Sequence, residues 1–327
     1  MFMLGYIVIL AHSGGMKQSR RIDVVLLLVA AVWGSSYLAA KVATTAIPVL
    51  VVLFLRYGLA AAACVALIGL WSGEVFCTRE ERRVGALLGV TQAAVLVLET
   101  YGVAHTSAAN AGLIISLTIV ITPLMDVSGR QRRLPGAFFA AATVCVLGVG
   151  LLVSATGLHA LRIGDILMLG AALVRAAHVA LVGRLTSGRD VRPLQLTTVQ
   201  TLVGAALFGV AASTQMPTLA HIDLRTWSVL IYLALFCSVF AFLAQTWAVQ
   251  RTSASRASLL LGTEPIWAVA AGILLGREHL TAIATIGAVL VIAGTFWGQS
   301  IERAHRSSRG GDGRISESVR PRAAQDA

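Results

Sequence analysis

The chain has 327 residues and a mass of 34.3 kDa, and 57% of its residues are hydrophobic whereas only 13% are charged. Soluble globular domains carry about 25% charged residues, so this composition excludes an ordinary water-covered surface and indicates a protein that crosses a membrane several times. The four cysteines show no CxxC or Cys/His spacing. We therefore expect no disulfide framework, no metal site and no cofactor.

Ten stretches of mostly apolar residues follow one another along the chain, each near the ~20 residues that a helix needs to cross a bilayer. Their connections are short, so we expect an all-α membrane protein with ten transmembrane helices in one bundle. The predicted spans are 23–43, 49–70, 84–103, 108–126, 136–154, 165–183, 194–213, 227–249, 257–276 and 281–299.

The basic residues alternate from one loop to the next. If the N-terminus lies inside the cell, the inside segments hold 20 of the 26 Lys and Arg residues, the outside segments three and the spans three. This asymmetry follows the positive-inside rule and predicts that both termini are cytoplasmic, in a protein of the cell membrane. The net charge of +11 then reflects topology and attraction to anionic lipids, and we expect no nucleic-acid partner.

The two ends of the chain differ from the apolar middle. Residues 1–22 are expected to form an N-terminal cytoplasmic segment, with Met16 as the natural start because the preceding apolar run is too short to span a membrane. Residues 300–327 are rich in Arg, Ser, Gly and Asp without apolar periodicity, which predicts a disordered basic cytoplasmic tail.

An internal repeat divides the middle into two units, 23–154 and 165–299. The segment ETYGVAHTSAANAGLI at 99–114 and the segment QTWAVQRTSASRASLL at 245–260 match at seven of 16 positions with a constant offset of 146. The shared Thr-Ser-Ala is polar, so hydropathy alone does not explain the match. Five helices in each half force opposite orientations in the bilayer, and such inverted repeats are typical of secondary transporters.

Several short motifs occur along both halves: Trp33-Gly34-Ser35-Ser36, Leu55-Arg56-Tyr57, Gly164-Asp165, Thr252-Ser253-Ala254, Glu264-Pro265 and Gly276-Arg277-Glu278. Together, over residues 20–300, they resemble the EamA family of the drug/metabolite transporter superfamily. The resemblance implies a ten-helix exporter of a small metabolite, often an amino acid or a toxic compound. The chain departs from the family pattern at Arg175, where a Trp is frequent.

Ionisable side chains within the spans are candidates for functional residues, because each costs about 2.5–3.5 kcal/mol on insertion scales. Arg56 and Glu99 lie at similar depth, and we predict an ion pair between them, with a packing role and a gating role both open. Arg175 and Glu264 lie nearer the midplane, where transporter sites form. We expect Arg175 to bind an anionic group of the substrate, and Glu264 to hold the guanidinium while the site is empty.

Aromatic residues deep in the spans complete the predicted cavity. Trp33 and Trp267 lie ten residues into their helices, too deep for an interfacial belt. His178 is a candidate proton relay, although a packing role stays open, and Lys41 is expected to extend outward from its helix end. The predicted substrate-cavity residues are Trp33, Tyr37, Arg175, His178, Glu264 and Trp267; no catalytic residue is predicted.

The favoured function is export of an amino acid or related carboxylated metabolite by alternating access. Multidrug or toxic-compound efflux is the near alternative, and an intramembrane enzyme or a non-transporting scaffold are the distant ones. The sequence has no HExxH and no GxSxG motif, which disfavours an enzyme, and a scaffold has no use for costly buried charges. The expected partners are a small-molecule substrate and membrane lipids; the coupling ion, a proton among the candidates, and the oligomeric state stay open.

Overall fold

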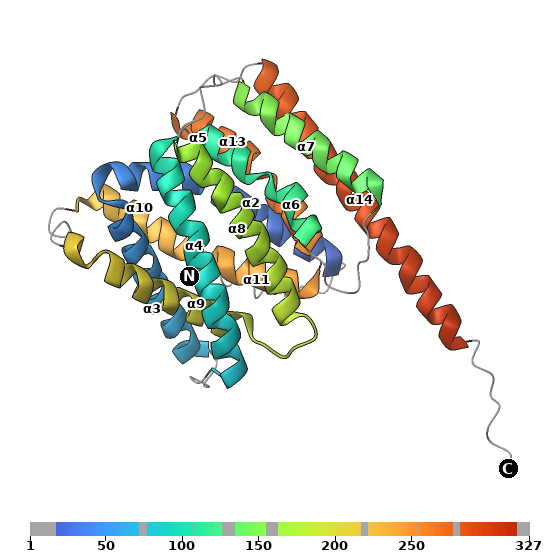
Figure 1. Ribbon diagram of the computed structural model, residues 1–327, viewed down its shortest axis with the longest axis horizontal. Coiled ribbons are helices and arrows are strands. Elements are labelled where there is room, and N and C mark those ends of the chain that lie inside the picture. Colours follow the sequence, from blue (N-terminus) through green and yellow to red (C-terminus); the bar gives the residue numbers. More distant parts are fainter. Residues whose placement is uncertain are drawn as a thin grey trace, which may run out of the picture.

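The computed structural model describes residues 18–71, 77–106, 108–125, 135–154, 163–216, 222–252, 254–276 and 282–318. All regular elements within these ranges are helical, and Figure 1 shows them in one bundle from which the end of α14 projects. The predicted segment before Gln18 and the last nine residues lie outside this description. The helices are α2 (Gln18–Ala46), α3 (Val49–Trp71), α4 (Arg79–His105), α5 (Ala108–Ile115), α6 (Thr118–Met125), α7 (Gly136–Ser154), α8 (Ile163–Thr186), α9 (Pro193–Ala211), α10 (Leu224–Ala234), the π-helix η2 (Leu235–Phe240), α11 (Ala241–Arg251), α12 (Ala254–Leu261), α13 (Glu264–Gly276) and α14 (Ala282–Ser318).

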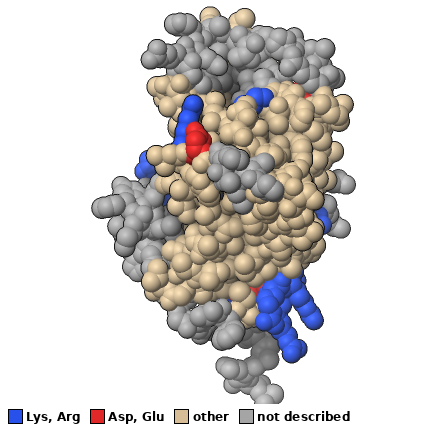
Figure 2. Space-filling model, turned by 90° about the vertical axis from the view of Figure 1, so that its left-hand side faces the viewer, with Lys and Arg blue, Asp and Glu red and all other residues tan. Residues whose placement is uncertain are grey.

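Six helices in the described ranges are long and apolar enough to cross a membrane: α2, α3, α4, α8, α9 and the continuous run of α10, η2 and α11. Shorter apolar stretches lie in α7 and α14. On the face shown in Figure 2, the visible Lys and Arg side chains lie toward the ends and the middle is nearly free of charge. The chain is thus a helical multi-pass membrane protein, and the number of ten spans stays a prediction.

The fourth predicted span of each half is interrupted at an equivalent point. Ser116 and Leu117 separate α5 from α6, and Gly262 and Thr263 separate α12 from α13; the repeat offset of 146 relates the two breaks. Pro265 explains the second break, because proline lacks the N–H that would continue the helix. The first half has no proline at that position, so packing produces the same break there. Discontinuous helices in matching places are where many transporters build their sites.

The glycine of the Trp-Gly motif has a packing role. A Cβ atom on Gly34 would lie 2.5 Å from the backbone oxygen of Glu264 and 2.7 Å from the Cβ of Trp267, both closer than real Cβ contacts. Only a glycine therefore lets α13 approach α2 this closely. That approach places the first residue of α13, Glu264, in the interior of the bundle, where it is 2% exposed.

The last helices of the two halves, α7 and α14, lie side by side (Figure 1). A Cβ atom on Gly148 would meet the backbone oxygen of Gly287 at 2.8 Å, and one on Gly294 would meet the Sγ of Cys145 at 2.6 Å. The repeat offset of 146 relates Gly148 to Gly294. Each half therefore contributes one equivalent glycine to this close helix contact.

α14 continues without a break to Ser318, through the first part of the tail for which disorder is predicted. Adding residues to an existing helix gains one backbone hydrogen bond per residue and needs no new nucleus. A polar composition therefore did not suffice to end this helix at the edge of the apolar stretch.

Candidate substrate cavity

A cavity lies in the bundle between α2, α3, α4, α8 and α11. Four of the six predicted cavity residues line it, and so do both members of the predicted ion pair. These lining residues are Trp33, Tyr37, Arg175, His178, Arg56 and Glu99.

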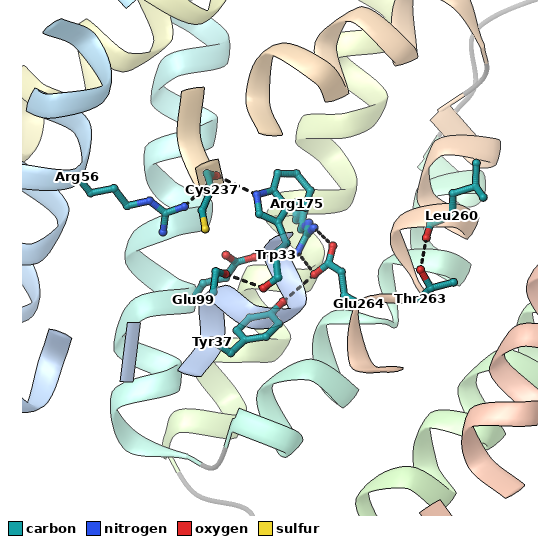
Figure 3. A network of polar contacts seen from close by, with 10 residues as sticks. Trp33, Tyr37, Arg56, Glu99, Arg175, Cys237, Leu260, Thr263 and Glu264 are labelled. Carbon is teal, nitrogen blue, oxygen red and sulfur yellow. Dashed lines mark hydrogen bonds and ion pairs between the residues drawn. The ribbon is translucent and has the colours of Figure 1, made fainter. Parts of the chain in front are cut away.

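The guanidinium of Arg175 is the centre of the polar network in Figure 3. Its two terminal nitrogens donate to the two carboxylate oxygens of Glu264, and Nη1 also donates to Oε1 of Glu99 at 3.2 Å. The Cζ atom lies 4.4 Å from the ring centre of Trp33, and the hydroxyl of Tyr37 donates to Oε2 of Glu264 at 2.9 Å. Two carboxylates and one aromatic face thus share a single buried cation.

The repeat explains why these side chains meet. Trp33 on α2 and Arg175 on α8 come from the first helices of the two halves, and the ring of one lies against the guanidinium of the other. Glu99 and Gln245 are related by the offset of 146, and both line the cavity. Two pairs of equivalent residues therefore converge on one site between the halves.

The predicted ion pair between Arg56 and Glu99 is not formed. Arg56 instead donates from Nε to the Oγ of Ser238 at 2.7 Å and from Nη2 to the backbone oxygen of Cys237 at 3.2 Å. Glu99 pairs with Arg175 because α8 packs along α4, whereas Arg56 on α3 reaches the π-helical turn η2. Similar depth in the membrane did not determine which side chains face each other.

Two further predictions need correction. The ring of Trp267 is 41% exposed and is not among the cavity-lining residues, because α13 packs on α2 through the Cβ atom of this residue. Lys41 does not extend outward: its Nζ donates to the backbone oxygens of Val103 at 2.9 Å and Thr106 at 3.0 Å. It thereby satisfies carbonyl groups that the end of α4 leaves free.

Sequence reasoning missed the amides of Gln92 and Gln245 in the cavity lining. Both are polar residues within apolar helices, and Gln245 is the repeat counterpart of Glu99, so the repeat offset was an available signal that was not used. His178 lies in the cavity wall as predicted, with Nδ1 2.8 Å from the Oγ1 of Thr91. Its proposed role in proton transfer stays a prediction.

A helical multi-pass protein with interrupted helices in both halves and a charged cavity between them has the features of membrane transporters built from repeats. The EamA-like transporter family matches residues 20–154 and 162–297, one copy in each half. The chain therefore belongs to the EamA-like transporter family.

Relatives and a solved structure agree with this assignment. An "Uncharacterized transporter" of Archaeoglobus fulgidus is 26% identical over 297 residues, covering 86% of this chain and 87% of the relative. A "Probable amino-acid metabolite efflux pump" of Escherichia coli is 26% identical over 295 residues, covering 85% and 94%. One crystal structure shares the fold with a TM-score of 0.72 at 16% identity, covering 86% of this chain and 98% of that one. The chain is thus a transporter of small molecules.

Proposed function

We propose that this protein exports a small carboxylated metabolite, such as an amino acid, across the cell membrane by alternating access. The observation that carries this proposal is the meeting of Trp33 and Arg175, from equivalent helices of the two halves, at one cavity. A cavity on the axis between two repeats is reached from either side when the halves tilt against each other. The printed name of the Escherichia coli relative supports both the outward direction and the metabolite class.

A polar contact joins the two halves at the end of the bundle where α2 begins. Arg256 of α12 donates to Oδ1 of Asp23 at 2.5 Å and to the Oγ of Ser19 at 2.8 Å. Both members of the ion pair are buried, with side chains 5% and 12% exposed. This ion pair, called the first latch (Asp23–Arg256), joins α2, the first helix of one half, to α12 in the interrupted helix of the other.

A second polar contact lies where α8 begins. Asp165, at the start of α8, accepts a hydrogen bond of 2.5 Å from the Oγ1 of Thr106, which follows α4. Asp23 and Asp165 thus occupy corresponding places at the start of the first helix of each half. This second latch, Thr106–Asp165, together with the first supports an occluded state that has to open at one end at a time.

The charge asymmetry of the loops orients the two latches. With ten spans, twenty of the 26 Lys and Arg residues fall in segments on one side, which supports cytoplasmic termini with the first latch at the cytoplasmic end. Reporter fusions after residues 47, 106, 158, 220 and 278 should then lie outside the cell, and fusions after residues 80, 131, 190 and 310 inside. A reproducible exchange between these groups would refute the ten-helix orientation.

Transport by purified protein in liposomes tests the proposed function. In a screen of amino acids, carboxylic acids and cationic drugs, liposomes are loaded with one unlabelled compound and the uptake of the same labelled compound by exchange is measured. We expect exchange of a carboxylated metabolite. Preference for drugs without a carboxylate would favour multidrug efflux instead. Uptake no faster than in protein-free liposomes for every class would contradict a transporter function.

A pair of matched variants links such transport to the cavity. Ser36 lines the cavity on α2, whereas Thr45 is exposed on the same helix. Ser36→Leu should fill the cavity and abolish exchange, and Thr45→Leu should leave it unchanged. Equal exchange by both variants would place the transport path elsewhere.

A further inference from the structure

Four formally charged side chains lie in or beside the cavity, two cations and two carboxylates, and three of them are joined through Arg175. Arg175 is bound by Glu264 through both carboxylate oxygens and by Glu99 through one. The side chains of Arg175 and Glu264 are 8% and 3% exposed, so little water screens them. Two carboxylates already hold this guanidinium, and an incoming anion would have to displace one of them from a buried contact. Arg175 is therefore poorly suited to bind an anion directly.

Arg56 is the fourth charged group, and its contacts are of a different kind. Its Nε donates to the hydroxyl of Ser238 and its Nη2 to the backbone oxygen of Cys237, so both acceptors are neutral. In the described part of the chain, no carboxylate oxygen lies within ion-pair distance of Arg56, and Nη1 has no hydrogen-bond partner there. The residue is 6% exposed and lines the cavity. An anion in the cavity would therefore be able to pair with Arg56 without displacing a carboxylate from it.

The π-helix η2 (Leu235–Phe240) holds this guanidinium in place. The widened turn lets the hydroxyl of Ser238 donate to the backbone oxygen of Leu233, five residues earlier, at 3.1 Å. The backbone oxygen of Cys237 accepts from both Arg56 and the indole Nε1 of Trp33, the latter at 3.0 Å. Single π-helical turns within α-helices often mark functional sites. Here the turn orients Arg56 through two acceptors and leaves Nη1 for a ligand.

We propose that Arg56, oriented by Ser238 and Cys237, is the group that binds the carboxylate of the transported molecule, while Arg175 stays in its structural ion-pair network. This inference rests on the proposed function and specifies its substrate site. Figure 3 shows the separation: Arg56 reaches toward Cys237 from one side, and Arg175, Glu264 and Tyr37 cluster on the other. An arginine suits this role because its planar fork matches the geometry of a carboxylate.

Equilibrium binding to detergent-purified protein tests the inference without any transport. The probes are three acids and their neutral amides of nearly the same size: propionate and propionamide, phenylacetate and phenylacetamide, and indole-3-acetate and indole-3-acetamide. We expect the protein to bind at least one acid tenfold or more tightly than its amide at pH 7. Arg56→Gln should remove this preference, and Ser238→Ala should weaken it because Nε of Arg56 then loses its partner.

Arg175→Lys is the matched control, since it keeps the charge of the other guanidinium. It should retain the preference for the acid over the amide even where its thermal stability falls. Arg56→Lys keeps the charge but loses the planar fork of the guanidinium, so it should lower the preference less than Arg56→Gln does. This variant also provides a test if Arg56→Gln does not fold. Four results would overturn the inference. The preference for the acid could survive in folded Arg56→Gln, or it could be unchanged in Arg56→Lys. It could also disappear in Arg175→Lys, or be absent from the unmodified protein. Failure of the proposed function would be seen separately, as binding without exchange in liposomes.

Discussion

Replacing Arg175 should destabilise the protein more than replacing either carboxylate that it binds. Arg175→Met leaves Glu99 and Glu264 buried without their shared cation, and removing one member of a buried pair costs about 3–5 kcal/mol. Glu264→Gln leaves Arg175 with Glu99, so its cost should lie at or below the lower end of that range. Glu99 contributes one hydrogen bond of 3.2 Å and its side chain is 16% exposed, so Glu99→Gln should cost the least, about 1–3 kcal/mol.

Thermal unfolding in lipid nanodiscs, followed by fluorescence-detected size exclusion, gives this ranking. The double variant Arg175→Met with Glu264→Gln should be more stable than the sum of the single losses predicts, because it removes both charges of the pair together. Arg189→Met serves as the control: it breaks an ion pair with Glu80 whose side chains are 42% and 52% exposed, worth about 0–1 kcal/mol. Equal losses for Arg175→Met and Glu99→Gln, or strict additivity in the double variant, would refute the shared-cation arrangement.

Two further substitutions test the packing around the cavity. Gly34→Ala should destabilise the protein by about 1–3 kcal/mol through overpacking against Glu264. Gly58→Ala on α3 is the control: a Cβ atom there meets nothing within 4 Å, so this variant should be more stable by up to about 1 kcal/mol. Similar unfolding temperatures for the two variants would contradict the close approach of α13. Lys41→Met should cost about 1.5–3 kcal/mol because the charged donor to the end of α4 is lost, and hydrogen exchange should rise at that end of α4; unchanged exchange there would mean that Lys41 does not hold this helix end.

The repeat was the most informative feature of the sequence. The offset of 146 relates the two helix breaks, before Thr118 and before Glu264, and it relates Glu99 to Gln245 on the cavity wall. Neither feature is predicted above, because spans 108–126 and 257–276 are expected to be continuous and the offset is not applied to Glu99. The repeat did bring Trp33 and Arg175 together in the predicted cavity.

Predictions based on depth in the membrane were less successful. Depth indicates how far along a helix a side chain lies, but not which neighbour it faces. Arg56 and Glu99 were therefore paired wrongly, and Trp267 was placed in the cavity although its ring is on the outside of the bundle. The π-helical turn that holds Arg56 has no signal in the sequence, since it depends on contacts with α2 and α3.

The central claim is that one cavity opens in turn to the two sides of the membrane. The test uses Ser36→Cys in a chain whose four natural cysteines are replaced by serine or alanine. A charged thiol reagent is applied to vesicles of either orientation, and the rate of labelling measures how accessible residue 36 is from each side of the membrane. Asp23→Asn should raise labelling from the cytoplasmic side and lower it from outside, and Asp165→Asn should do the reverse. An increase from the same side in both variants, or no change in either, would contradict alternating access through this cavity.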